Sequence, residues 1–274
     1  MNANKVWLVF RKDWREIKRN WQVLAPLIVI PLIISVVMPA VIMLIPNITP
    51  QTASSPQQLE ELLKNMPTSL KMEIAGMTSQ QAFSYILIVY LLAPLFLITP
   101  IMASSVISSD SFAGEKERKT IEALLATPIS DSELFLGKVL VSFIPAILIT
   151  FASFAIYGTV VDILGLSIFS GRLLLPNATW LIMVFGLAPL IALASIGLTV
   201  MISAKVKGFR EAQQISVILL LPVLAMMFGQ VSGVLFFGPL VTAAMIGVFA
   251  VVDLLVFYAG IKVFKREEIL AKPA

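Results

Sequence analysis

The chain has 274 residues, of which 58% are hydrophobic and 13% are charged, and its formal net charge is +4. The charged share is about half that of an ordinary soluble domain, so a soluble core could not bury this much apolar surface. Cysteine and histidine are absent, which excludes disulfides, thiolate metal sites, Cys or His nucleophiles and an imidazole proton relay.

The first 21 residues contain one amphipathic pattern. In "KVWLVFRKDWREIKRNW" apolar residues recur every three or four positions with basic residues between them, namely Trp7, Phe10, Trp14, Ile17 and Trp21. This spacing predicts a helix with a single apolar stripe, which suits a helix lying among lipid headgroups. Such a helix can anchor the chain and fix its topology, or it can help to dock a partner protein, and the pattern leaves both roles open.

Six apolar runs follow, each long enough to cross a bilayer as a helix of roughly 20 residues. They cover 22–45, 82–108, 138–160, 178–203, 214–235 and 239–261. The predicted fold is therefore an all-α polytopic membrane protein with one transmembrane domain over 1–274. The glycine-rich stretch 228–240 is interpreted either as a tight turn or as a re-entrant element.

The basic residues predict the orientation of the spans. Of the 20 lysines and arginines, only Lys64, Lys71 and Arg172 lie outside the N-terminus, the 110–138 and 204–213 loops and the 262–274 tail. Under the positive-inside rule, both termini and these two loops face the cytoplasm. We therefore expect a multi-pass protein of the cell membrane, with the lipid bilayer around it.

The loop 110–137 is the longest charged passage. We expect the second span to end near Ser108 and Gly114 to let the chain leave that helix. The next residues, "EKERKTIEALLA", predict a short helix with Ile121, Leu124 and Leu125 on one face. Either this face packs back on the membrane domain or another protein covers it.

Helix signals also mark the end of this loop. Pro128 stops the short helix because proline lacks the amide needed to continue the hydrogen-bond ladder. Ser130 and Glu133 form the Ser-x-x-Glu pattern of a capping box, which predicts the start of the third span.

This loop resembles the cytoplasmic loop of ABC type-2 transporter permeases, the membrane subunits of type V ABC exporters. The shared pattern comprises Glu115, Glu117, Arg118, Thr120, Glu122, Leu124, Leu125, Thr127, Pro128, Gly137 and Lys138. The stretches "AKVKGFREAQQIS" (204–216) and "KVFKREEIL" (262–270) are similar to the second cytoplasmic loop and the C-terminal end of that family. The first outer loop departs from the sodium-exporter-like members, which carry a large domain there.

The resemblance implies that the loop carries a coupling helix that docks on a separate nucleotide-binding ATPase subunit. The implied docking residues are Glu115, Glu117, Arg118, Thr120, Ile121, Glu122, Leu124, Leu125, Thr127 and Pro128, and a possible second contact comprises Lys207, Arg210 and Glu211. It also implies a second permease copy, as a homodimer or a related heterodimer.

ATP and Mg are expected on the partner subunit, because the chain has no G-x-x-x-x-G-K-[ST] motif. We expect no cofactor, metal, catalytic residue or nucleic-acid partner for this chain.

Two other function classes remain as alternatives. A gradient-driven carrier or channel would need several paired ionisable groups within the spans, and a membrane-embedded enzyme would need a convergent set of catalytic groups. Asp253 is the only acidic residue well inside a predicted span. It is a functional candidate, or it pairs with Lys262 near the cytoplasmic end or lies at a subunit interface. The residues favour an export permease and leave its substrate open.

Overall fold

The computed structural model describes residues 2–48, 68–120, 127–232 and 238–263. The regular structure in these ranges is helical throughout, without a strand. Six helical segments are long and apolar enough to cross a membrane, namely Trp21–Leu44, Ser79–Glu117, Asp131–Ile168, Ala178–Lys205, Phe209–Val231 and Pro239–Tyr258. The predicted all-α polytopic class and its six spans are confirmed.

Several spans are built from consecutive helices with π-helical or 3-10 turns between them. Their bounds are α2 (Trp21–Leu32), η1 (Ile33–Val37) and α3 (Met38–Ile48); α6 (Ser79–Tyr85), η2 (Ile86–Leu91), α7 (Leu92–Phe96), α8 (Ile98–Ser109), η3 (Asp110–Gly114) and α9 (Glu115–Glu117); α11 (Asp131–Ile168); α12 (Ala178–Ile182), η4 (Met183–Leu187) and α13 (Ala188–Lys205); α14 (Phe209–Ser216), η5 (Val217–Leu220) and α15 (Leu221–Val231); and α16 (Pro239–Val263).

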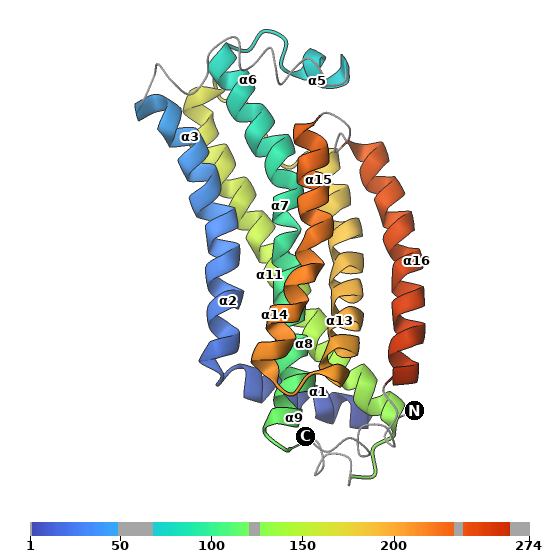
Figure 1. The fold of residues 1–274 in the computed structure, drawn as a ribbon. Helices are drawn as coiled ribbons and strands as arrows, with labels where there is room; N and C mark the ends of the chain where they lie inside the picture. The colour runs from blue at the N-terminus through green and yellow to red at the C-terminus, as the bar shows by residue number, and fades with distance from the viewer. Residues whose placement is uncertain (1, 49–67, 121–126, 233–237, 264–274) are drawn as a thin grey trace.

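The spans stand side by side, and α1 (Ala3–Ile17) crosses one end of the bundle, close to α9 and the start of α11 (Figure 1). We call this the α1 end. The short helix α5 (Thr68–Glu73) lies at the opposite end (Figure 1). The last helix, α16, stands at the edge of the bundle and packs on α12, η4 and α13.

The second and third spans are longer than predicted. The third is one helix of 38 residues, or about 57 Å at 1.5 Å per residue, whereas the hydrocarbon core of a bilayer is about 30 Å thick. The second does not end near Ser108 but continues through Gly114 to Glu117. These extra turns at the α1 end carry charged residues that we had assigned to the loop 110–137.

A Schellman motif, rather than Gly114, ends the second span. Lys119 adopts a left-handed conformation with φ +56°. The amide of Thr120 donates to the carbonyl of Glu115 at 3.0 Å, and the amide of Lys119 donates to that of Lys116 at 3.1 Å. These two bonds satisfy the last carbonyls of the helix, which is the usual function of this motif. The predicted apolar face of Ile121, Leu124 and Leu125 lies outside the described residues, as does Glu122.

The predicted capping box at the start of the third span is confirmed. The Ser130 hydroxyl accepts from the Glu133 amide at 3.4 Å, and the Ser130 amide donates to Glu133 Oε2 at 3.0 Å. The helix begins at Asp131, seven residues before the predicted span.

An aromatic core joins the second, third and fourth spans. Trp180 and Tyr157 are fully buried and stack at 4.7 Å between ring centroids. The Tyr157 hydroxyl donates to the Ile88 carbonyl at 2.7 Å, and Trp180 Nε1 donates to the Val89 carbonyl at 2.8 Å. Both acceptors belong to the π-helical turn η2. The side-chain donors of this core are therefore paired with backbone carbonyls of the turn. Polar groups at membrane depth need such partners because no water is available there.

Candidate functional site

Four segments meet at the α1 end: α1, η3 with α9, the first turns of α11, and the turn that leads into α14. We call the polar contacts among them the junction. The predicted docking residues Ile121, Glu122, Leu124 and Leu125 fall in the segment 121–126, which lies outside the described residues.

The centre of the junction is Lys138, whose side chain is 0% exposed. Its ammonium lies 2.6 Å from Glu115 Oε2, 3.3 Å from Asp13 Oδ2 and 3.2 Å from the Ser111 hydroxyl. A buried lysine needs such partners because an unpaired charge away from water is very costly. Lys138 thus joins α11 to α1 and to the end of the second span.

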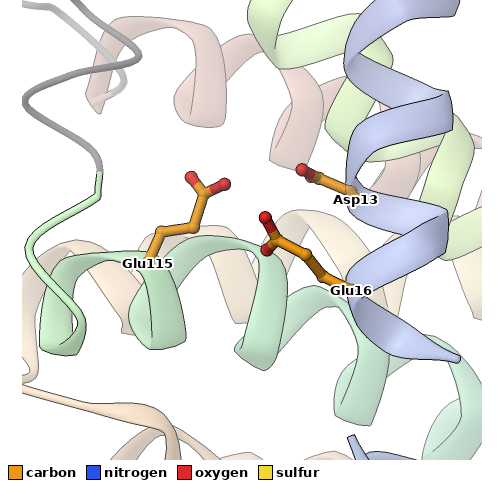
Figure 2. Close-up of side chains that lie close together, drawn as sticks. All are labelled: Asp13, Glu16 and Glu115. Atoms are coloured by element: carbon orange, nitrogen blue, oxygen red, sulfur yellow. The ribbon is translucent and has the colours of Figure 1, made fainter. Parts of the chain in front are cut away.

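A second lysine, Lys12, lies among three carboxylates. Its ammonium is 3.1 Å from Asp13 Oδ1 and 3.3 Å from Glu16 Oε1, and it also pairs with Glu115 Oε1. Figure 2 shows the side chains of Asp13 and Glu16 from α1 and Glu115 from α9 converging on one space. Carboxylates in this arrangement can hold a metal ion, but here the Lys12 ammonium supplies the positive charge that they need.

Burial and charge act in opposite directions on the ionisation of this cluster. Burial raises the pKa of Asp13, but the charges of Lys138 and Lys12 outweigh burial and hold that pKa below its ordinary value. Burial lowers the pKa of Lys12, but Asp13 and Glu115 outweigh it and hold that pKa above 10.5. Asp13 and Lys12 are therefore both charged near neutral pH.

Close packing fixes α1 on α11. A Cβ atom at Gly137 would lie 2.7 Å from Val9 Cβ and 3.1 Å from the Val6 carbonyl. Only glycine allows this approach without a shift, and Lys138 follows directly with its bond to Asp13. The predicted Gly-Lys pair is thus the place where α1 docks on the third span.

A neighbouring set of contacts ties α9 to the start of the first span. The Arg118 guanidinium pairs with Asp110 at 2.9 Å and with Glu16 at 3.7 Å. The Asn20 side-chain amide donates to the same Asp110 oxygen at 3.1 Å, and Asn20 also caps α2. Burial lowers the pKa of Arg118, and the bond to Asp110 outweighs it and raises that pKa.

The two predicted cytoplasmic contacts lie together around one polar pocket. The pocket has a volume of 250 Å³, and its lining includes Arg118 from the first and Arg210 from the second. Glu117 Oε2 accepts from the Phe209 amide at 2.8 Å. A Cβ at Gly208 would lie 2.5 Å from that oxygen, so a larger residue here would displace the Glu117 side chain. Lys207 and Glu211 are exposed, and the Lys207 amide donates to Glu211 Oε2 at 2.9 Å.

The predicted docking residues divide into two groups in the structure. Glu115 is 1% exposed and is fully engaged with the two lysines, so it acts inside the chain rather than on a docking surface. Glu117 and Arg118 are exposed but bond within the junction, and Thr120 and Pro128 are exposed while Thr127 is half-buried.

The predicted stripe of α1 needs correction. The helix ends at Ile17, and Trp21 belongs to α2. Its buried face comprises Val6, Val9, Asp13 and Ile17, whereas Trp7 is 58% exposed and Phe10 and Trp14 are half-buried. Trp7 stacks on Phe10 at 4.8 Å between ring centroids. Asp13 is a junction residue that the stripe did not predict, although its i, i+4 spacing from Val9 and Ile17 is a signal for it.

Asp253 lies in α16 and is 7% exposed. Neither of its carboxylate oxygens has a hydrogen-bond partner within the described part of the chain. The Lys262 side chain lies outside the described residues, so pairing with it stays a prediction.

The sequence model of the family described as "ABC-2 family transporter protein" matches residues 7–244. This range covers all four segments of the junction. No curated protein matches the chain.

Proposed function

Because the chain belongs to the ABC-2 family of transporter proteins, and is thus a multi-pass membrane permease of an ABC system, we propose that it forms the transmembrane pathway of an exporter. A separate ATPase subunit binds ATP and Mg and docks at the α1 end through the segment 121–126 and the residues around it. A second permease copy, identical or related, completes the pathway. The substrate stays open, because a fold-level resemblance does not choose a cargo.

The observation that carries this proposal is the salt bridge between Glu115 and Lys138, 2.6 Å long and buried. These residues flank the predicted docking segment on its two sides. A displacement of that segment by a partner would therefore move the second and third spans together. The distribution of charge supports a cytoplasmic position for the α1 end. The basic residues of α1, of α9 and of the segment 205–210 all lie at this end of the bundle.

Co-purification with a candidate ATPase, followed by ATP-driven transport in proteoliposomes, tests the proposal. We expect Leu124→Asp and Glu117→Arg to reduce both assembly and coupled transport by at least about tenfold, because each places an unmatched charge where a partner docks. Lys71→Glu is the matched control, since it changes a charge in α5 at the opposite end.

Unchanged assembly and unchanged coupled transport in both variants would contradict the docking proposal. Ion-driven uptake by this chain alone, in liposomes without ATP, would favour a gradient-driven carrier instead.

A further inference from the structure

A second polar pocket lies at the end of the bundle opposite α1. It has a volume of 770 Å³, and its lining includes Glu73 from α5, Tyr85 and Tyr90 from the second span, and Arg172 from the turn before α12. The lining also includes Leu173 and Leu240, which are 64% and 82% exposed. The pocket therefore combines two opposite charges with apolar side chains that face outward.

The half of the pocket around Glu73 offers hydrogen-bond acceptors. The hydroxyls of Tyr85 and Tyr90 donate to the same oxygen, Glu73 Oε2, at 3.0 and 2.5 Å. Both hydroxyls thus donate to the carboxylate, and a phenolic oxygen can also accept a hydrogen bond. No lysine or arginine of the described residues forms a salt bridge with Glu73. This half suits a primary ammonium, which carries three N–H donors and a positive charge.

The half around Arg172 offers donors. Among the described residues Arg172 has no salt bridge, and it lines the same pocket as Glu73, Tyr85 and Tyr90. The fourth and sixth spans both begin at this pocket, with Ala178 and Pro239 in its lining. A guanidinium binds phosphate oxygens in a bidentate manner, and helix N-termini favour anions.

We propose that this pocket binds the headgroup of a phosphoethanolamine lipid. The phosphate lies at Arg172, the ammonium lies at Glu73 with Tyr85 and Tyr90, and the acyl chains leave past Leu173 and Leu240. An anionic headgroup without an ammonium leaves Glu73 unmatched, and a quaternary ammonium has no N–H to donate. This assignment is independent of the ATPase docking, which concerns the other end of the bundle.

Native mass spectrometry of the purified full chain in detergent, titrated with dioleoyl lipids, tests the proposal. We expect phosphatidylethanolamine to bind at least about tenfold more tightly than phosphatidylcholine or phosphatidylglycerol, because a charge-assisted hydrogen bond contributes roughly that much. Glu73→Gln should remove this preference, whereas Arg172→Gln should weaken the binding of all three lipids, because all three carry the phosphate. Lys71→Gln, which removes a charge from the same helix outside the pocket, should leave it unchanged.

Equal binding of the three lipids would overturn the proposal. So would an unchanged preference in Glu73→Gln, or unchanged affinities in Arg172→Gln, provided that the variant keeps wild-type thermal stability. Soluble glycerophosphoethanolamine has the same headgroup without acyl chains, so it tests whether the headgroup alone or the whole lipid is the ligand. We expect it to displace the lipid only in large excess, and displacement at equal concentration would overturn the assignment to a lipid.

Discussion

Replacement of Lys138 by methionine should release α1 from the bundle. The lysine is fully buried and contacts Asp13, Ser111 and Glu115. Methionine keeps an unbranched side chain, one heavy atom shorter, but leaves one oxygen of each carboxylate without its cation. Removing one partner of a buried ion pair costs about 3–5 kcal/mol. We expect a value of about 3 kcal/mol, at the lower end, because Lys12 still pairs with both carboxylates.

Hydrogen exchange of the amides in α1 measures this loss. A free energy of about 3 kcal/mol corresponds to roughly 100-fold faster exchange, since 1.36 kcal/mol is a factor of ten. Arg15→Met is the matched control, because Arg15 is an exposed residue of the same helix. Exchange in Lys138→Met equal to that in the control would refute the claim that Lys138 holds α1.

A double-mutant cycle with Asp13→Asn isolates the pair from other effects of the substitution. The two single variants and the double variant should reveal a coupling free energy of about 1–3 kcal/mol, because the residues are in contact and share partners. Strict additivity would mean that the bond of 3.3 Å between Lys138 and Asp13 does not stabilise the docking of α1.

Two further predictions concern the same docking. Gly137→Ala should displace α1 and lower the free energy of unfolding by about 1–3 kcal/mol, because its Cβ would lie 2.7 Å from Val9 Cβ. Thermal unfolding measures this loss. Gly158→Ala in the same helix is the control and should show no such loss, because the nearest atom to its Cβ is 3.9 Å away. Protection factors of α1 should be constant between about pH 5 and about pH 9 and fall only outside this range. Because the pKa of Asp13 is lowered, its stabilisation is lost only as the pH falls into the acid range. Because the pKa of Lys12 is raised, its stabilisation is lost only as the pH rises above 10.5. A transition near neutral pH would contradict both assignments.

The spans could be predicted from the sequence because hydropathy and the need for internal backbone hydrogen bonds decide them locally. Their ends could not. Glu115 reads as a loop residue in a hydropathy pattern, and Lys138 as the first residue of the third span. In the structure both lie inside helices, where each neutralises the other. The capping box of Ser130 and Glu133 was visible because its partners are three residues apart.

The junction escaped prediction for a related reason. Asp13 and Lys138 are separated by 125 positions in the sequence, and helical periodicity relates only near neighbours. The tryptophan stripe drew the prediction to one face of α1, whereas the face that packs on α11 carries Val9, Asp13 and Ile17. A charged residue at helical spacing between two apolar residues would have indicated a buried partner of opposite charge.

The position of the junction constrains how a docked partner could act on the pathway. In the sequence, the segment 121–126 falls between the second span, which ends at Glu117, and the third, which begins at Asp131. Glu115 and Lys138, one in each of these helices, bind each other. If the two spans were joined only by a flexible loop, a displacement of this segment would not reach them. The buried bond between Glu115 and Lys138 instead makes both spans move together. The bond between Lys138 and Asp13 connects the third span to α1. The bond between Asn20 and Asp110 connects the second span directly to the start of the first. We infer that a partner at the α1 end moves the first three spans together. Lys138→Met, which removes the buried bonds of the junction, should therefore uncouple ATP hydrolysis from transport without preventing assembly.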